Sequence, residues 1–212
     1  MTKSLIGQKP AYWAKARRHL AREDAVLASI IQAHPRVTMT RRSDPFCTLA
    51  RSIVGQQISV KAAATVWGRF EAAVQEVVPE RVLSVSPTTL QGAGLSRRKV
   101  EYVHGLAEGF RCGEVRPQDW PDMDDEAVIE QLTAVRGIGR WTAEMFLMFN
   151  LLRPDVLPLD DVGLQKAVAH HYFRGRRVTA RTIRRVAAKW APWRSVATWY
   201  LWRSLDPVPV EY

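Results

Sequence analysis

Two adjacent carboxylates, Asp160 and Asp161, are the residues of this chain best suited to acid chemistry. They follow a basic turn with two glycines, Arg136 to Arg140, by about twenty residues. A carboxylate held at a fixed distance from a bound polymer can stabilise positive charge that develops on it, or orient an attacking water. An isolated Asp-Asp pair more often caps a helix, here the one expected from Val162. Both interpretations remain open at this point.

The turn itself reads Arg136-Gly137-Ile138-Gly139-Arg140. Each glycine can take a positive φ that a side chain would resist, so we expect a tight turn. Its backbone N–H groups and the start of the next helix would then point outward together, with Arg136 and Arg140 adding charge, which suits a phosphate oxygen. Ile138 can pack between the helices and hold the turn rigid. Most Gly-x-Gly turns are only structural, but the flanking helices, the arginines and the charge of the chain favour phosphate binding.

The overall charge indicates a polyanionic partner. The 212 residues include 31 Lys and Arg against 21 Asp and Glu, a formal net charge of +10. The cations gather in clusters such as Arg97-Arg98-Lys99 and Arg184-Arg185. This pattern is typical of nucleic-acid-binding proteins, although a basic surface can also serve solubility alone.

Composition also argues against several classes of protein. Two cysteines 65 residues apart, Cys47 and Cys112, cannot form a thiolate metal site or a disulfide framework. Five histidines, with His170 and His171 adjacent rather than at helical spacing, argue against a zinc hydrolase. No apolar stretch is long enough to span a bilayer, and the N-terminus does not resemble a signal peptide. We therefore expect a soluble intracellular protein without a membrane partner.

Apolar residues recur at spacings of three and four, which predicts an all-α protein. We expect helices over 10–33 (broken near Asp24), from Pro45 to Gly55, from Ser59 onward, from Ser86 to Gln91, and over 97–110 after Ser96. Further helices are expected over 124–135, 141–152, 162–171, 180–190 after Thr179, and 192–205. The turn thus joins two helices.

Several phrases of the sequence together resemble a known family. VRGIGRWTAEMFLMF followed by LPLDDVGLQKAV is similar to the helix-hairpin-helix DNA glycosylase superfamily, and closest to the DNA-3-methyladenine glycosylase II family. That family also carries phrases like IVGQQIS (53–59), GLSRRKVEY (94–102) and WAPWRSVATWYLW (190–202). Four phrases in the same order cover most of residues 45 to 203, which makes the resemblance specific.

The resemblance implies cleavage of an N-glycosidic bond. Positive charge builds on the deoxyribose in that reaction, so a carboxylate beneath the sugar stabilises the transition state. By resemblance this catalytic residue is Asp161. Asp160 is then interpreted as the helix cap or as a supporting partner.

The residue after the hairpin bears on the mechanism. In relatives such as endonuclease III that also nick DNA, a lysine here attacks the sugar, whereas this chain has Trp141. The resemblance therefore implies a monofunctional enzyme that uses water and leaves an abasic site. Trp141 and Trp202 correspond to pocket aromatics whose indole faces attract a cationic alkylated purine. Met145 takes a third pocket position, often tyrosine in the family, and leaves the range of lesions open. The other six tryptophans are interpreted as core residues.

A target base must leave the duplex to reach the catalytic carboxylate. In the family a side chain from the loop that matches Gly55-Gln56-Gln57 fills the gap, and Gln57 aligns with that wedge. The alternative is that Gln56 and Gln57 only satisfy backbone groups of their turn.

The resemblance also implies a monovalent or similar hard cation at the hairpin, with a structural role. Its ligands by position are the main-chain oxygens of Thr133, Val135 and Ile138. An iron–sulfur cluster is excluded because it needs four cysteines. We expect no cofactor to be required for the reaction.

We therefore predict two helical lobes. One spans residues 45–150 and includes the helix-hairpin-helix motif at about 124–152; the other joins 1–44 to 151–212. Asp161 is expected in the cleft between them.

The predicted function is excision of alkylated purines of the 3-methyladenine type from double-stranded DNA in base excision repair. We expect a monomer, cytoplasmic in a prokaryote or nuclear in a eukaryote. Two alternatives remain: a non-catalytic helix-hairpin-helix DNA-binding module, and a bifunctional enzyme that also cleaves the strand.

Overall fold

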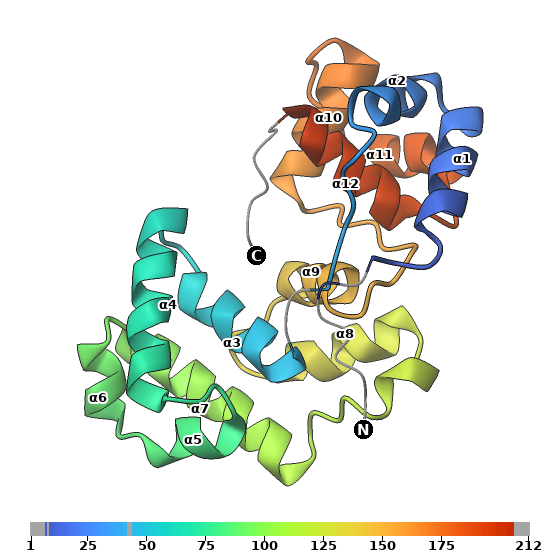
Figure 1. Ribbon diagram of the computed structural model, residues 1–212. Helices are drawn as coiled ribbons and strands as arrows, with labels where there is room; N and C mark the ends of the chain where they lie inside the picture. Colours follow the sequence, from blue (N-terminus) through green and yellow to red (C-terminus); the bar gives the residue numbers. More distant parts are fainter. Residues whose placement is uncertain (1–6, 8, 42–43, 206–212) are drawn as a thin grey trace. The chain divides into compact units, whose positions relative to one another are not determined.

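The computed structural model describes residues 7, 9–41 and 44–205. Over these residues the regular secondary structure is helical and contains no strand, which confirms the predicted all-α class. Figure 1 shows the helices in chain order from blue to red. In chain order they are α1 (Trp13–Glu23), α2 (Ala25–Ala33), α3 (Pro45–Gly55), α4 (Val60–Val74), α5 (Pro79–Ser84), α6 (Pro87–Gly92), α7 (Arg97–Cys112), η1 (Trp120–Asp122), α8 (Asp125–Ala134), α9 (Arg140–Phe149), α10 (Val162–Phe173), α11 (Ala180–Ala187), η2 (Ala188–Trp190) and α12 (Arg194–Leu205), where η marks a short 3₁₀ helix.

Polar side chains fix where most helices begin. The hydroxyls of Ser59, Ser96 and Thr179 accept hydrogen bonds from the third backbone N–H that follows, at the starts of α4, α7 and α11. Each satisfies one of the donors that a helix N-terminus leaves without an intrahelical partner. Asp24 does the same for α2 and separates it from α1, which confirms the expected break.

The observed helices differ from the predicted ones in several places; α1 begins at Trp13 rather than at Pro10, and η1 was not predicted. Helix α5 was not anticipated, because six residues with one buried side chain, Val82, carry almost no periodic signal. Helix α9 ends at Phe149 rather than at 152, where Leu152 takes the left-handed conformation with φ 55°. Helix α12 begins at Arg194, two residues after the proline expected to open it.

The described residues fall into two compact units. The first unit combines residues 7–41 with 147–205, and the second contains residues 44–146. The division therefore falls inside α9, after Phe146, a few residues from the expected limit at 150. Figure 1 shows α1, α2, α10, α11 and α12 gathered in the first unit.

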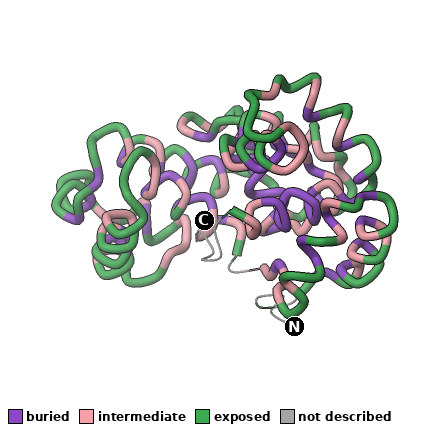
Figure 2. Tube along the Cα trace, turned by 90° about the horizontal axis from the view of Figure 1, so that it is seen from above, coloured by how far each residue is buried: buried purple, intermediate pink, exposed green. Residues whose placement is uncertain are grey.

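The core of the first unit is built from both ends of the chain. Trp13, Leu20 and Leu27 pack in one buried cluster with residues of α10 and α12 such as Leu164 and Tyr200. Figure 2 shows buried and exposed residues alternating along these helices, as expected where one face of each packs inward.

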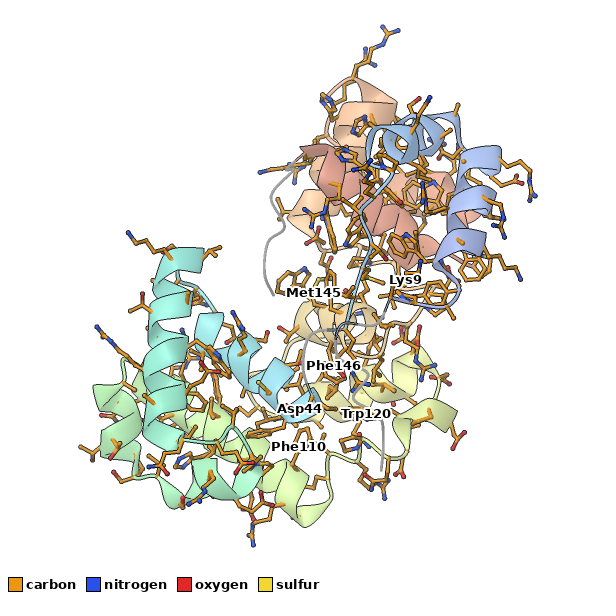
Figure 3. All side chains as sticks on the ribbon, viewed as in Figure 1. Lys9, Asp44, Phe110, Trp120, Met145 and Phe146 are labelled. Atoms are coloured by element: carbon orange, nitrogen blue, oxygen red, sulfur yellow. The ribbon has the colours of Figure 1, made fainter. Side chains whose placement is uncertain are left out.

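The core of the second unit surrounds α7. Phe46 of α3 meets Phe110 of α7 edge-on, with ring centroids 5.3 Å apart. Trp120 and Phe146 make a similar contact at 5.1 Å, and Figure 3 labels these two residues and Phe110. This contact ties η1 to α9 and so supports the helix that follows the basic turn.

Candidate nucleic-acid interface and catalytic carboxylate

The basic turn connects α8 to α9, and one glycine determines its shape. Gly137 has φ +98°, and a β-carbon there would lie 2.5 Å from two ring carbons of Tyr102. The N–H of Ile138 donates to the carbonyl of Val135 at 3.0 Å, and the Ile138 side chain is buried. The predicted tight turn with an anchoring isoleucine is therefore present.

Gly139 differs from the expectation that both glycines take a positive φ. It does not appear among the glycines with positive φ, and a β-carbon there would meet nothing within 4 Å. The residue is exposed. Because it has no side chain, the main chain at the start of α9 is open to an approaching group. Gly139 therefore provides access to the backbone, whereas Gly137 provides a positive φ.

Both arginines of the turn already have acidic neighbours. Arg140 donates to both carboxylate oxygens of Glu126 and to Glu144 at 3.1 Å. These hydrogen bonds and charges raise the pKa of Arg140 above its ordinary value. Arg136 lies 3.9 Å from Glu101 and over the ring of Tyr102. A phosphate at the turn would thus accept hydrogen bonds from backbone N–H groups. Arg136 and Arg140 would exchange their acidic neighbours for this phosphate.

A polar hollow of about 380 Å³ adjoins the turn. Its lining joins three segments of the second unit: Gln56 and Gln57; Ser96, Arg98, Lys99 and Tyr102; and Gly137, Ile138 and Gly139. Within it the Lys99 ammonium donates to the Val54 carbonyl at 2.8 Å, and burial lowers its pKa. Arg98 donates to the Tyr102 hydroxyl at 2.9 Å.

The sequence analysis named Arg98 and Lys99 as part of a basic cluster that indicates a polyanionic partner, but it assigned neither them nor Tyr102 to a site. The signal that could have placed them is the position of this cluster directly after a helix cap. Such a cluster places cations at the positive end of a helix, where they add to the attraction for an anion.

The two glutamines after Gly55 behave differently. The Gln56 amide donates to the Gly137 carbonyl at 2.8 Å, so this residue satisfies a backbone group of the α8–α9 turn and not one of its own turn. Gln57 is exposed and takes φ 57°, a conformation that is strained for a residue with a side chain. Backbone strain of this kind often occurs where function requires a particular side-chain direction. Ile58 and Val60 next to it are exposed apolar residues, 40% and 63% accessible.

A second, mainly apolar hollow of about 530 Å³ also borders this loop. Gln57, Ile58, Gly139, Trp141 and Thr142 contribute to its lining, with residues of α3 and α4. The structure therefore brings Trp141 and the proposed wedge residue to one cavity within the second unit.

Met145, also expected in the base pocket, is 5% accessible and is not among the residues that line this hollow. Six of the eight tryptophans are buried, as predicted for core residues. Trp141 and Trp202, the two with proposed roles, are only partly buried. This difference separates them from the tryptophans that serve packing.

Asp161 lies in the first unit as the N-cap of α10. Its Oδ1 accepts a hydrogen bond from the Leu164 N–H at 2.6 Å and another from the Trp202 indole N–H at 2.7 Å. The residue is only 6% accessible. Two donors on one oxygen fix the plane of the carboxylate. Asp160, expected as the cap or as a supporting partner, is exposed and is not the N-cap, because the helix begins at Val162 and Asp161 directly precedes it.

A glycine makes this contact between Asp161 and Trp202 possible. A β-carbon on Gly163 would lie 2.9 Å from Trp202 Cδ1 and Nε1 and 3.0 Å from Asp161 Oδ1. On its other side, Trp202 stacks against Phe149, with ring centroids 6.0 Å apart and an interplanar angle of 21°. Trp202 is thus held by stacking and by its hydrogen bond to the carboxylate.

The main-chain oxygens expected to hold a cation suit such an ion. Helix α8 ends at Ala134, which leaves its last carbonyls without intrahelical partners. The oxygens of Thr133 and Ile138 accept no hydrogen bond from any residue that the structure describes, and that of Val135 accepts one. Neutral carbonyl oxygens are ligands for hard cations.

The described residues contain no second candidate metal centre made of side chains. In residues 7, 9–41 and 44–205 there is no group of three or more His, Cys, Asp or Glu side chains that could hold an ion. Cys47 and Cys112 are not joined in a disulfide. None of the described helices is long and apolar enough to cross a bilayer.

Comparison with known proteins supports the resemblance. Residues 50–192 match the model of the HhH-GPD superfamily base excision DNA repair proteins. The DNA-3-methyladenine glycosylase 1 of Schizosaccharomyces pombe is 30% identical over 167 residues, which cover 77% of this chain and 73% of that protein.

Two solved structures are similar over nearly the whole chain. A DNA-3-methyladenine glycosidase from Bacillus halodurans is 35% identical, with a TM-score of 0.83 and coverage of 94% of this chain and 93% of that one. The Schizosaccharomyces pombe 3-methyladenine DNA glycosylase in complex with abasic DNA is 28% identical, with a TM-score of 0.77 and coverage of 92% and 100%. The chain belongs to the HhH-GPD superfamily of base excision DNA repair proteins.

Proposed function

We propose that this protein is a monofunctional DNA glycosylase that excises alkylated purines of the 3-methyladenine type from duplex DNA. The observation that carries the proposal is the buried Asp161 carboxylate, which is oriented by Trp202 and by the start of α10. The two solved relatives described above act, by their names, on 3-methyladenine in DNA, and one of them is bound to abasic DNA.

In the proposed reaction the carboxylate of Asp161 faces the deoxyribose. As the bond between the sugar and the base breaks, positive charge develops on the sugar and the electron pair leaves with the base. A fixed negative charge in a largely dry site stabilises that state without reorganisation of its surroundings. Water then adds to the sugar carbon and loses a proton, which leaves an abasic site.

DNA binding is assigned to the second unit. The backbone N–H groups at Gly139 and the start of α9 would receive a phosphate, with Arg136 and Arg140 nearby and Arg98 and Lys99 in the adjoining hollow. Gln57, exposed and in a strained conformation, is proposed to fill the space left by the flipped base. Gln56 holds the wedge loop to the turn through Gly137.

Of the residues proposed to receive the flipped base, Trp141 and Met145 belong to the second unit and Trp202 belongs to the first. A cationic purine is attracted to the face of an indole by about 0.5 to 2 kcal/mol, which favours an alkylated base over a neutral one. Met145 would contribute an adaptable apolar surface.

The lack of strand cleavage is inferred from Trp141. An indole cannot form a Schiff base with the sugar, so the route through an amine nucleophile is absent at this position. A cation held by Thr133, Val135 and Ile138 would neutralise phosphate charge near the turn.

Substitution of Asp161 by Asn tests the catalytic assignment. The variant should lose release of 3-methyladenine from methylated duplex DNA, with the single-turnover rate reduced by at least about a thousandfold, while its binding to abasic DNA is retained. Asp160→Asn is the matched control, since it removes an exposed charge one residue away, and should keep its activity. If the wild type releases no base, the protein is a non-catalytic DNA-binding module instead.

Borohydride trapping tests the monofunctional assignment separately. A glycosylase that uses water gives no covalent adduct with DNA when borohydride is added during turnover, and its product strand stays intact until it is heated in alkali. A trapped adduct would show that an amine of this chain attacks the sugar and would contradict the role given to Trp141.

A further inference from the structure

The positive charge of the chain is concentrated in one segment. Residues 162–205 contain ten Lys and Arg residues and no Asp or Glu. The rest of the chain has 21 basic and 21 acidic residues, so this segment accounts for the whole formal charge of +10. A charge so unevenly distributed creates a strong local field.

Six arginines form the densest part of this segment, and all six are exposed. They lie at the C-terminal end of α10, in the connection to α11 and on α11 itself, and we refer to them as the arginine surface: Arg174, Arg176, Arg177, Arg181, Arg184 and Arg185. Among the described residues none of the six makes an ion pair with a carboxylate. By contrast, arginines of the second unit such as Arg97, Arg111 and Arg116 have acidic partners.

The fold places three of these six side chains on one face of α11. Ile183 and Ala187 are buried against the core of the first unit. Arg181, Arg184 and Arg185 lie at the exposed positions of the same helix, so packing turns them toward solvent. Repulsion among unpaired arginines disfavours the folded state, and a bound polyanion relieves it.

The arginine surface lies at the opposite end of α10 from Asp161. Asp161 caps the N-terminus of this helix, and Arg174 caps its C-terminus. Twelve residues at 1.5 Å each separate the two ends by about 18 Å along the helix axis. A phosphate bound to the arginine surface is therefore not the one beside the sugar at Asp161.

We propose that the arginine surface binds the phosphate backbone of undamaged duplex DNA, separately from the lesion site. Guanidinium groups match phosphate oxygens in geometry, and several of them on one helix face suit a regular line of phosphates. The inference rests on the proposed function only in taking DNA as the polyanion. It gives the protein a second, sequence-independent contact with DNA.

A triple variant, Arg181→Gln with Arg184→Gln and Arg185→Gln, tests this proposal. Glutamine has a helix propensity close to that of arginine, so α11 should be kept. The matched control is Arg69→Gln with Arg81→Gln and Arg111→Gln, three exposed helical positions of the second unit, which gives the same net charge. Fluorescence anisotropy measures binding of an undamaged 20-base-pair duplex after the lesion site has been saturated with a short unlabelled abasic duplex.

We expect the saturated wild type and the control to bind the labelled duplex, and the arginine-surface variant to bind it at least about tenfold more weakly. The slope of log affinity against log salt should fall by about 2 to 3 in magnitude, at about 0.9 per lost phosphate contact. Equal weakening in both triple variants, or no binding by the saturated wild type, would overturn the proposal. Tighter binding of a single-stranded RNA, lost only in the arginine-surface variant, would assign the surface to RNA instead.

Base release from a short methylated duplex is measured in parallel and should be unchanged in the arginine-surface variant. If no protein in the series releases a base, the proposed glycosylase function fails, while the anisotropy result still decides the second contact.

Discussion

Asp161 uses one carboxylate oxygen for two purposes. Oδ1 caps α10 through the Leu164 N–H and receives the Trp202 indole N–H. The capping interpretation and the catalytic interpretation of this residue are therefore compatible, because the cap itself holds the carboxylate in place. Trp202 acts on the proposed reaction through Asp161 as well as through the face of its ring.

The Gly163→Ala substitution should distinguish the effect of the Asp161–Trp202 contact on base release from the effect of the glycine on stability. Alanine in a helix is ordinarily more stable than glycine by up to about 1 kcal/mol, but here its β-carbon would press on the Trp202 ring at 2.9 Å. Displacing that donor removes a hydrogen bond to a charge, worth about 1.5 to 3 kcal/mol, so base release should slow about ten- to a hundredfold. Single-turnover kinetics and thermal unfolding measure the two effects.

Gly68→Ala in α4 is the control for this change, since nothing lies within 4 Å of a β-carbon there. It should raise the melting temperature slightly and leave base release unchanged. Full activity of Gly163→Ala would show that the indole hydrogen bond does not orient the carboxylate.

At the scale of elements, the hairpin depends on a helix that is distant in sequence. Tyr102 of α7 occupies the space beside Gly137, and the Gln56 amide holds the carbonyl of the same residue. The turn is thus fixed from two sides by the segments that also line the polar hollow next to it.

Alanine substitutions at the two glycines of the turn should have different consequences. Gly137→Ala combines a positive φ with a 2.5 Å approach to Tyr102, so we expect a loss of about 2 to 4 kcal/mol in the free energy of unfolding. Gly139 has neither a positive φ nor a neighbour within 4 Å of a β-carbon, so Gly139→Ala should change the free energy of unfolding by less than about 1 kcal/mol. The added methyl group beside the main chain should weaken duplex binding. Chemical denaturation and anisotropy distinguish the two; equal stability of both variants would contradict the assigned role of Tyr102.

At the scale of the molecule, a buried carboxylate ties the two ends of the chain together within the first unit. Asp24 is 1% accessible. It accepts hydrogen bonds from the Tyr172 hydroxyl at 2.6 Å and the Trp190 indole at 2.8 Å, and pairs with Lys189 at 3.2 Å. These partners follow it by about 150 residues or more, so one side chain joins α2 to α10 and η2.

This network should make stability depend on pH. Burial by itself raises the pKa of Asp24, but the hydrogen bonds from Tyr172, Trp190 and the Leu27 N–H, with the charge of Lys189, hold it below its ordinary value of 3.8. A depressed folded pKa contributes stability above the unfolded pKa and loses it as the pH falls through the folded one.

Asp24→Asn should therefore lower the free energy of unfolding by about 2 to 4 kcal/mol at neutral pH. The difference from the wild type should begin to shrink below about pH 4, where Asp24 of the unfolded chain takes up a proton, and should be lost as the pH falls through the lower pKa of the folded state. Thermal unfolding across pH 3 to 7 measures this, with Asp160→Asn as an exposed control. A difference that stays constant over the whole range would show that the charge of Asp24 is not what stabilises the unit.

The sequence by itself determined the helical class, most helix starts and the residues of the turn, because apolar spacing and capping side chains act over a few neighbouring residues. It also identified the family from four phrases, and with it Asp161. The contacts of Tyr102 with Gly137, of Trp202 with Asp161 past Gly163, and of Asp24 with Trp190 were decided only by the tertiary structure. Each joins residues about 35 to 170 positions apart, and no local pattern encodes which distant side chain fills a given space.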